Sequence, residues 1–274
     1  MSEKYVDLHL HTTASDGSFT PKELVKRAVE LGFSAIAITD HDTVGALKEG
    51  VELAKENGIE MVPGIELNTD YENTEIHILG YYIDFSDEKL VNKLISLQEA
   101  RYNRIKNIVQ KLNEVGIDID FDNVANLAQD AALGRPHIAQ LMLEKGYVKE
   151  WSDAFDKYIG KGCPAYVERK KLTPKEAIQL IKGVGGVPIL AHPVLMERDD
   201  LLPKLIEWGI EGLEVYHTEH DKGDIKRYLE FVRENKLLMT AGSDCHGPKR
   251  KKEILMGKIK GPISILEELK SAKK

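Results

Sequence analysis

Histidines and carboxylates stand at regular places along this 274-residue chain. His9 and His11 are two positions apart in an apolar run, so an extended strand directs both imidazoles to one face, together with Asp7. Two neutral imidazoles on one face can reach a single metal ion. Similar side chains occur in or directly after the other apolar runs, namely His41, Glu66, His77, His192, His217, Asp244 and His246.

This mixture of donors predicts a cluster of metal ions. Imidazole and carboxylate ligands without cysteine suit Zn²⁺, Mn²⁺ or Fe²⁺. About nine donors are more than the four that a single structural zinc ion takes, so two or three divalent ions are expected. A carboxylate such as Glu66 could bridge two of them. A lone histidine is more often structural, but histidines and acids at the end of every run favour the metal interpretation.

The elements that carry these residues read as alternating strands and helices. Thr20-Pro21-Lys22-Glu23 and Thr173-Pro174-Lys175-Glu176 are each a capping box with proline at the first helical position. Strands alternating with helices indicate βα units in a mostly parallel sheet or barrel, whose carboxyl-terminal edge carries the chemistry. The expected strands are Tyr5–His11, Ala35–Thr39, Glu60–Ile65, Glu75–Ile83, Val187–Ala191, Gly212–Tyr216 and Leu237–Ala241.

One stretch departs from this alternation. Residues 86–165 are poor in strand signals, and apolar residues such as Leu90, Leu94, Leu97 and Ile105 follow helical spacing. We therefore expect a barrel formed by residues 1–85 and 166–274, with residues 86–165 as a helical insertion or cap.

Composition limits the class of protein. Hydrophobic content of 42% with 30% charged residues is typical of a globular chain. The net charge of −7 disfavours binding of long nucleic acid by bulk charge, but allows a small phosphorylated substrate once cations line the site. The N-terminus lacks a signal-peptide pattern and no segment predicts a membrane span. Only two cysteines, Cys163 and Cys245, favour a reducing cytoplasm. Nothing in the sequence indicates the oligomeric state.

The order of these motifs resembles the PHP (polymerase and histidinol phosphatase) domain family. The resemblance implies a distorted (β/α)₇ TIM-like barrel with a trinuclear metal site, and Arg135-Pro136-His137 resembles its TrpH-like phosphoesterase branch. The matching motifs are His9-x-His11, Asp16, Thr39-Asp40-His41-Asp42, Gly64-Ile65-Glu66, His77, Ala191-His192-Pro193 and Ser243-Asp244-x-His246.

The resemblance also implies a ligand set for each ion. It assigns His9, His11, Glu66 and Asp244 to one ion, Glu66, His77 and His192 to a second, and Asp16, His41 and His246 to a third. The residues by themselves support only the pairing of His9 with His11.

Three further residues could contact substrate. The planar fork of Arg135 matches phosphate oxygens, although a helix-start salt bridge would equally account for an arginine there. His137 could contact phosphate or serve a helix N-terminus. His217 could bind phosphate or protonate the leaving group, and a structural role is the alternative. Asp244 and His217 are the expected catalytic residues. His220 is expected to be exposed, and Lys249-Arg250-Lys251-Lys252 to be a solvated basic loop.

The resulting expectation is a hydrolase of phosphoric esters that uses metal-activated water. The resemblance favours the 3′-phosphate of nucleoside 3′,5′-bisphosphates, with short RNA 5′ ends as a further substrate. A histidinol-phosphate phosphatase shares the core motifs. A non-catalytic metal-binding module and an amidohydrolase are alternatives from other classes.

Overall fold

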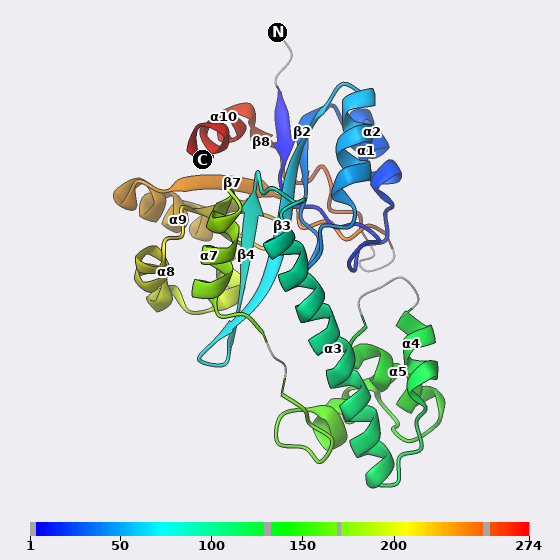
Figure 1. The fold of residues 1–274 in the computed structure, drawn as a ribbon. Helices are drawn as coiled ribbons and strands as arrows, with labels where there is room; N and C mark the ends of the chain where they lie inside the picture. Colours follow the sequence, from blue (N-terminus) through cyan, green and yellow to red (C-terminus); the bar gives the residue numbers. More distant parts are fainter. Residues whose placement is uncertain (1–3, 129–132, 169–170, 249–252, 274) are drawn as a thin grey trace. The chain divides into compact units, whose positions relative to one another are not determined.

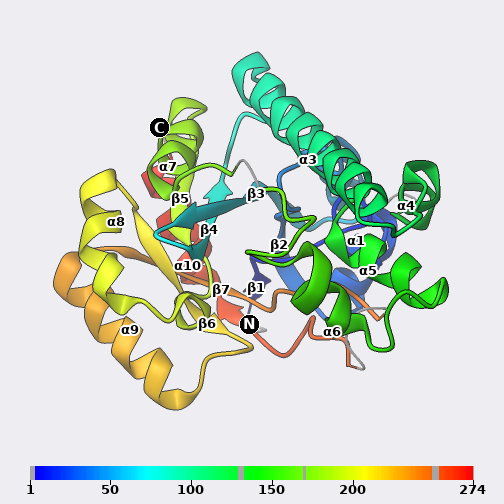
Figure 2. The ribbon, with the colours of Figure 1, turned by 90° about the horizontal axis from the view of Figure 1, so that it is seen from below.

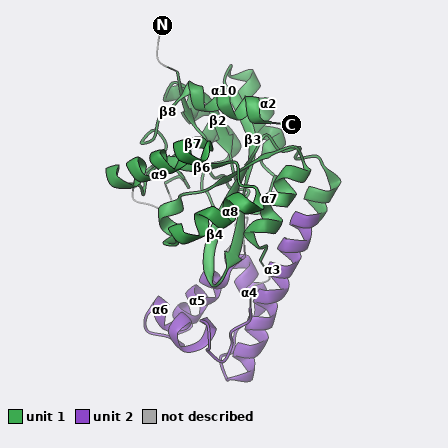
Figure 3. Cartoon of the chain, turned by 90° about the vertical axis from the view of Figure 1, so that its left-hand side faces the viewer, with its two compact units in different colours: residues 1–92, 171–274 green, residues 93–170 purple. Residues whose placement is uncertain are grey.

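The computed structural model describes residues 4–128, 133–168, 171–248 and 253–273 (Figure 1). The chain divides into two compact units (Figure 3). Unit 1 comprises Met1–Asn92 and Lys171–Lys274, and unit 2 comprises Lys93–Lys170. The boundaries expected from sequence, 85/86 and 165/166, fall seven and five residues before those of the units.

Unit 1 is a nearly closed barrel of strands with helices outside it, as Figure 2 shows from one end. The order of strands is β7-β6-β5-β4-β3-β2-β1-β8, so the predicted barrel is confirmed. The two-residue strand β8 pairs antiparallel with β1 and was not predicted. The strands are β1 (Tyr5–Asp7), β2 (Phe33–Ile38), β3 (Glu60–Tyr71), β4 (Thr74–Tyr81), β5 (Val187–Leu190), β6 (Gly212–His217), β7 (Leu238–Gly242) and β8 (Gly261–Pro262).

The segment after β1 joins the two sides of the barrel. The expected first strand, Tyr5–His11, is shorter in the structure, because β1 ends at Asp7. The following residues nevertheless form backbone hydrogen bonds on both sides. The Leu8 amide donates to the Ala241 carbonyl oxygen at 2.9 Å, and the Leu10 carbonyl oxygen accepts the Thr39 amide at 2.9 Å. His9 and His11 are therefore held between the ends of β2 and β7.

Strand β4 runs against its neighbours. It pairs antiparallel with both β3 and β5, whereas β1–β2, β2–β3, β5–β6 and β6–β7 are parallel. A reversed strand presents its first residues, not its last, at the edge where the parallel strands end. His77 lies early in β4, opposite Asn68 of β3, and so reaches the same edge as the residues that follow β2, β5, β6 and β7.

Helices cover the outside of the barrel. Both predicted capping boxes are present, at Thr20 before α1 and at Thr173 before α7, and in each the threonine side chain accepts the amide three residues on. Among the described residues, no helix combines the length and apolar character that crossing a membrane requires. The helices of unit 1 are α1 (Pro21–Glu30), α2 (Leu47–Glu56), α7 (Pro174–Gly183), α8 (Leu202–Trp208), α9 (Lys222–Asn235), α10 (Ile263–Ala272) and the short η2 (Pro193–Met196) and η3 (Asp199–Leu201).

Apolar side chains of the strands form one buried core. Val6, Leu8 and Ala35 pack with Ile189, and α10 closes this layer with Ile265 and other aliphatic residues, all of them buried. Leu8 is in this core, whereas the neighbouring His9 is not, as the alternation of side chains along an extended segment requires. Removing this much apolar surface from water fixes the strand ends on which the polar residues stand.

Unit 2 is helical and has its own core. Helix α3 (Glu88–Glu114) begins in unit 1 and continues through unit 2. Buried residues such as Ile108, Leu112, Ile138 and Met142 pack together. The other elements of this unit are α4 (Phe121–Ala128), α5 (Arg135–Glu144), α6 (Trp151–Ala154) and η1 (Phe155–Ile159).

Candidate metal centre

The carboxylate of Glu66 lies at the centre of a ring of histidines. It projects from the middle of β3 and is 1% exposed. Its Oε2 lies 3.3 Å from His9 Nε2 and 3.2 Å from His11 Nε2. The same oxygen is 3.0 Å from His41 Nδ1. Its Oε1 lies 2.8 Å from His77 Nδ1 and 3.1 Å from His192 Nε2. One carboxylate thus faces two sets of imidazoles, each through a different oxygen.

Asp244 stands beside the first of these sets. It follows β7 with a positive φ of 52°, a region that non-glycine residues seldom occupy. Its Oδ1 lies 3.1 Å from His11 Nε2 and 3.5 Å from His9 Nε2. With Glu66, these residues form a group whose ligand atoms all lie within 4.8 Å of one another.

A second group gathers around Asp16. Its Oδ1 is 3.2 Å from His246 Nε2, and its Oδ2 is 3.8 Å from His41 Nε2. The rings of His11 and His246 stack with their centroids 4.1 Å apart. His11, Asp16, His41 and His246 again offer donor atoms within 4.8 Å of one another. The structure therefore brings together all nine residues that the sequence analysis proposed as ligands.

The unpaired atoms of this cluster fit a divalent cation. Within the described part of the chain, His9 Nε2 and both ring nitrogens of His11 are buried and lack a hydrogen bond. Burying a polar atom without a partner costs free energy, yet carboxylate oxygens lie only 3.1–3.5 Å from these Nε2 atoms. Imidazole nitrogens and carboxylates that converge without bonding to one another are the donors that a transition-metal ion uses.

The cluster shifts the pKa values of its members in the metal-free chain. Burial alone would raise the pKa of Glu66, but the adjacent His41, His9 and His77 hold it well below its usual value. Burial alone would lower the pKa of His11, yet Asp244 and Glu66 raise it to about 10. Burial likewise opposes protonation of His77, and Glu66 raises its pKa to about 9. The carboxylates thus favour positive charge at positions that a divalent cation could take.

A hydrogen-bonded loop presents Asp16. Asp40, the second residue after β2, accepts the Thr12 amide at 2.7 Å and the Thr12 hydroxyl at 2.6 Å. Its Oδ1 also accepts from Ser15 Oγ at 2.5 Å. Gly17 then passes so close to His11 that a Cβ there would lie 2.5 Å from the His11 carbonyl oxygen. Asp40 belongs to a motif named in the sequence analysis, but nothing there assigned it this role.

His217, the last residue of β6, faces the cluster. Its Nδ1 accepts the backbone amide of Glu219 at 3.1 Å. In the neutral ring the proton must then reside on Nε2. That Nε2 is buried, has no hydrogen-bond partner among the described residues and lies 3.9 Å from Asp244 Oδ2. His217 can therefore donate a hydrogen bond toward the centre.

The expectation for His220 was wrong, because its side chain is buried with 8% exposure. Its Nδ1 lies 2.9 Å from the Val215 carbonyl oxygen, and its ring packs between His217 and Tyr228. The turn after β6 folds back over the strand, which charged neighbours in the sequence did not indicate.

Sequence reasoning also missed Glu214. This fully buried carboxylate of β6 contacts His9 and the amide of His192. A signal was available, since a charged residue inside the apolar run Gly-Leu-Glu-Val-Tyr-His needs a buried partner.

Known proteins resemble this chain in sequence and in fold. The PHP domain model matches residues 7–162, more than half of the chain. The chain belongs to the PHP family. A 5′-3′ exoribonuclease of Haemophilus influenzae is 35% identical over 90% of this chain and 92% of its own length. A 3′,5′-nucleoside bisphosphate phosphatase of Chromobacterium violaceum is 31% identical over 89% and 87%. A crystal structure described as a metal-dependent phosphoesterase from Bifidobacterium adolescentis has a TM-score of 0.80 and 32% identity, covering 98% of this chain and 96% of that one.

Membership of the PHP family confirms the predicted class of enzyme. These relatives hydrolyse phosphoric esters, and this chain is a phosphoesterase of the same family. The family's metal dependence agrees with the donor cluster, which offers several groups able to hold an ion.

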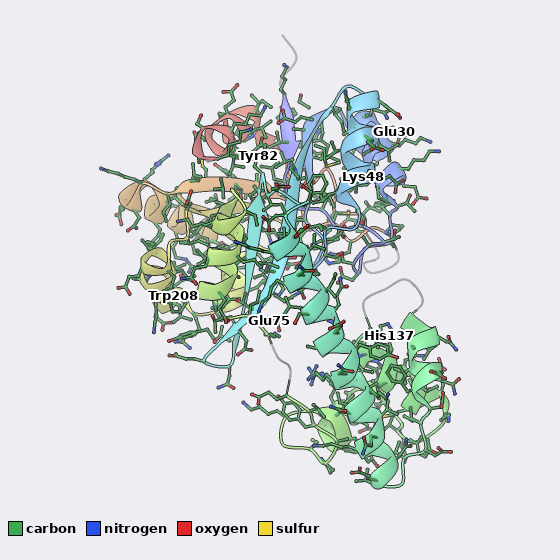
Figure 4. All side chains as sticks on the ribbon, viewed as in Figure 1. Glu30, Lys48, Glu75, Tyr82, His137 and Trp208 are labelled. Carbon is green, nitrogen blue, oxygen red and sulfur yellow. The ribbon has the colours of Figure 1, made fainter. Side chains whose placement is uncertain are left out.

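Arg135 and His137, the expected substrate contacts, lie in unit 2 of this PHP chain, at the start of α5. His137 is labelled in Figure 4. Arg135 Nη1 donates to the Ile159 carbonyl oxygen at 3.3 Å, and its guanidinium lies 5.4 Å from the ring centroid of Phe155. His137 Nδ1 accepts the amide of Gly134 at 3.1 Å. Each thus has a structural contact within unit 2. The basic run at 249–252 lies outside the described residues.

Proposed function

We propose that this PHP chain removes the 3′-phosphate of nucleoside 3′,5′-bisphosphates and trims 5′-phosphorylated short RNA, with two or three Mn²⁺, Zn²⁺ or Fe²⁺ ions. The observation that carries the proposal is the position of Glu66, whose two oxygens face separate sets of histidines. A carboxylate in that position is suited to bridge two ions, and paired ions are typical of phosphoester hydrolysis.

Each ion has a proposed ligand set. His9, His11, Glu66 and Asp244 match a group of converging donors, and so do Asp16, His41 and His246 together with His11. The remaining set consists of His77 and His192 with Glu66, whose Oε1 lies near both imidazoles. The ligands proposed for the three ions are His9, His11, Glu66 and Asp244; Glu66, His77 and His192; and Asp16, His41 and His246.

Bound ions would lower the pKa of water and neutralise phosphoryl oxygens. The chain's own groups complete the reaction. A water oxygen forms the new bond to phosphorus while the bond from phosphorus to the 3′ oxygen breaks. The proton that the attacking water loses goes to solvent, and solvent returns one to the departing 3′ oxygen. His217, whose Nε2 carries the proton in the neutral ring, donates a hydrogen bond to that oxygen as it departs. The products are inorganic phosphate and a nucleoside 5′-phosphate.

The same chemistry would serve both proposed substrates. Removing a 3′-phosphate and removing the first nucleotide of a 5′-phosphorylated oligoribonucleotide both break the bond between phosphorus and a 3′ oxygen. The names of the Chromobacterium and Haemophilus relatives correspond to these two reactions. Arg135 and His137 are the candidate phosphate-binding residues, because a guanidinium can bond two phosphate oxygens at once. We place the reaction in the cytoplasm.

A substrate panel tests the proposal. Metal-reconstituted protein is given adenosine 3′,5′-bisphosphate, a 5′-phosphorylated trinucleotide or L-histidinol phosphate, with Asp244→Ala as the inactive control. We expect kcat/KM for the two nucleotide substrates to exceed that for histidinol phosphate by at least about tenfold, a difference of about 1.4 kcal/mol in transition-state binding. Preference for histidinol phosphate would support the rival phosphatase, and no turnover of any ester would support a non-catalytic module.

A further inference from the structure

Glu214 links two residues of the proposed metal centre from outside the ligand set. Both of its carboxylate oxygens lie 3.1 Å from His9 Nδ1. Its Oε2 also accepts the backbone amide of His192 at 2.9 Å. The side chain is completely buried, so these contacts are shielded from water. One carboxylate therefore contacts residues on both sides of Glu66.

A bulge in β6 allows this arrangement. Successive side chains of a regular strand alternate between its faces, so Glu214 and His217 would face opposite ways. The pairing of β6 with β7 shifts register between Glu214 and Tyr216. As a result Glu214, His217 and His9 all have donor atoms within 4.8 Å of one another. Bulges commonly redirect a side chain in this manner next to functional sites.

Gly242 provides the space for the contact. A Cβ at this position would overlap His9 and would lie 2.6 Å from Glu214 Oε1. Any larger residue at the end of β7 would push the carboxylate away from the imidazole. Two features of the fold, the bulge in β6 and this glycine in β7, thus bring Glu214 to His9.

The contact determines which nitrogen of His9 is available. An ionised carboxylate can only accept hydrogen bonds, so His9 Nδ1 must donate. In the neutral ring this leaves the lone pair on Nε2, the atom near Glu66 Oε2 and Asp244 Oδ1. At His192, where the backbone has a φ of 24°, the same carboxylate anchors the amide of a strained residue.

We propose that Glu214 is a positioning residue of the metal centre, which sets the tautomer of His9 and anchors His192, so that one buried carboxylate orients ligands of two ions. The inference rests on the proposed metal-dependent function. Carboxylates behind ligating histidines elsewhere change metal affinity by about 10–100-fold when removed.

Glu214→Gln tests this role with little change of shape. If the carbonyl oxygen of the glutamine keeps the place of Oε2 and still accepts the His192 amide, its amide nitrogen takes the place of Oε1, which lies 3.1 Å from His9 Nδ1. If the amide nitrogen faces His9, Nδ1 must become the acceptor, and the proton moves to Nε2. The matched control is Glu211→Gln, which removes the same charge from the residue immediately before β6. Glu211 forms an ion pair with Lys182 at 3.0 Å.

Metal binding itself is the readout. Chelator-treated wild type, Glu214→Gln and Glu211→Gln are titrated with Zn²⁺ against a chromophoric chelator, and their folding is compared by far-UV circular dichroism. We expect Glu214→Gln to bind at least one ion about 10–100-fold more weakly, with its fold intact, and Glu211→Gln to match wild type. Wild-type affinity at every site in Glu214→Gln would overturn the inference and leave the proposed function standing. If wild type binds none of Zn²⁺, Mn²⁺ and Fe²⁺, the proposed function itself fails.

A measurement on the unaltered chain covers the case in which Glu214→Gln does not fold. In Zn²⁺-loaded wild type with ¹⁵N-labelled histidine, long-range ¹H–¹⁵N correlations distinguish protonated from metal-bound ring nitrogens. The His9 signals are assigned by their loss in His9→Asn. We expect a protonated Nδ1 and a metal-bound Nε2, and the reverse pattern would refute the role of Glu214.

Discussion

Glu66 and His192, 126 positions apart in the chain, meet with Oε1 and Nε2 3.1 Å from each other. The opposite oxygen of Glu66 faces His9, His11 and His41. Replacing the carboxylate by an amide, Glu66→Gln, keeps the shape of the side chain. It removes the negative charge and one of the two acceptor oxygens.

We expect Glu66→Gln to lose turnover by at least about 10³-fold, because several kcal/mol of charge stabilisation depend on ions that this residue would bridge. The measurements are phosphate release from adenosine 3′,5′-bisphosphate and the number of ions bound per chain. Glu60→Gln, on the same strand, where Glu60 pairs with Lys270 at 2.6 Å, serves as the control. Wild-type activity and ion content in Glu66→Gln would contradict the bridging role.

His217 is expected to act on the leaving group. For His217→Ala we predict that kcat for the bisphosphate falls by about 10²–10³-fold, since the 3′ oxygen then departs without a positioned hydrogen-bond donor. The kcat for p-nitrophenyl phosphate should fall much less, because its leaving group is stable as an anion. His220→Ala removes the neighbouring buried histidine, whose Nδ1 bonds to Val215 rather than facing the cluster, and is the matched control. Equal losses for the two esters would assign His217 a different role.

Stability of the metal-free protein should depend on pH. The folded pKa values of about 10 for His11 and about 9 for His77 exceed the unfolded value of 6.5. Their protonation therefore stabilises the fold fully below pH 6.5, and this contribution is lost as pH rises through 9 and 10. We expect the free energy of unfolding in urea, with chelator present, to decrease from pH 7 to 9.5. His77→Gln should reduce this slope, and a flat or rising profile in the wild type would contradict the account.

Arg135 provides a test of phosphate recognition. If its guanidinium binds a substrate phosphate, Arg135→Ala should raise KM for the bisphosphate by about 10–100-fold, the equivalent of a hydrogen bond to a charged group of about 1.5–3 kcal/mol. Lys157→Ala removes another cation of unit 2, one paired with Asp153, and should leave KM unchanged. If Arg135→Ala alters only the melting temperature, its contacts with Ile159 and Phe155 are its whole role.

The sequence predicted the parts of this protein that depend on local chemistry. The threonine caps of α1 and α7 could be predicted because a capping box uses only four consecutive residues. The alternating apolar runs predicted βα units in a sheet or barrel, and the resemblance to the PHP family implied the barrel. The convergence of His77 with the other histidines was less predictable, since its early position in β4 reaches the site only because that strand is antiparallel.

Other features depend on contacts between distant segments. Glu214 faces His9 because a bulge shifts the pairing of β6 with β7. The residue types in β6 do not predict that shift. The burial of His220 depends on a turn that folds its ring against Tyr228 of α9. Such placements are set by packing rather than by local propensity, so they require the structure.

Reconstitution of activity with metal tests the central claim most directly. Protein stripped by chelator is given increasing equivalents of Mn²⁺, and phosphate release from adenosine 3′,5′-bisphosphate is measured at each step. We predict no turnover without metal and full turnover once two or three equivalents are bound. Turnover by the stripped protein, at a rate that added Mn²⁺ does not change, would contradict the account.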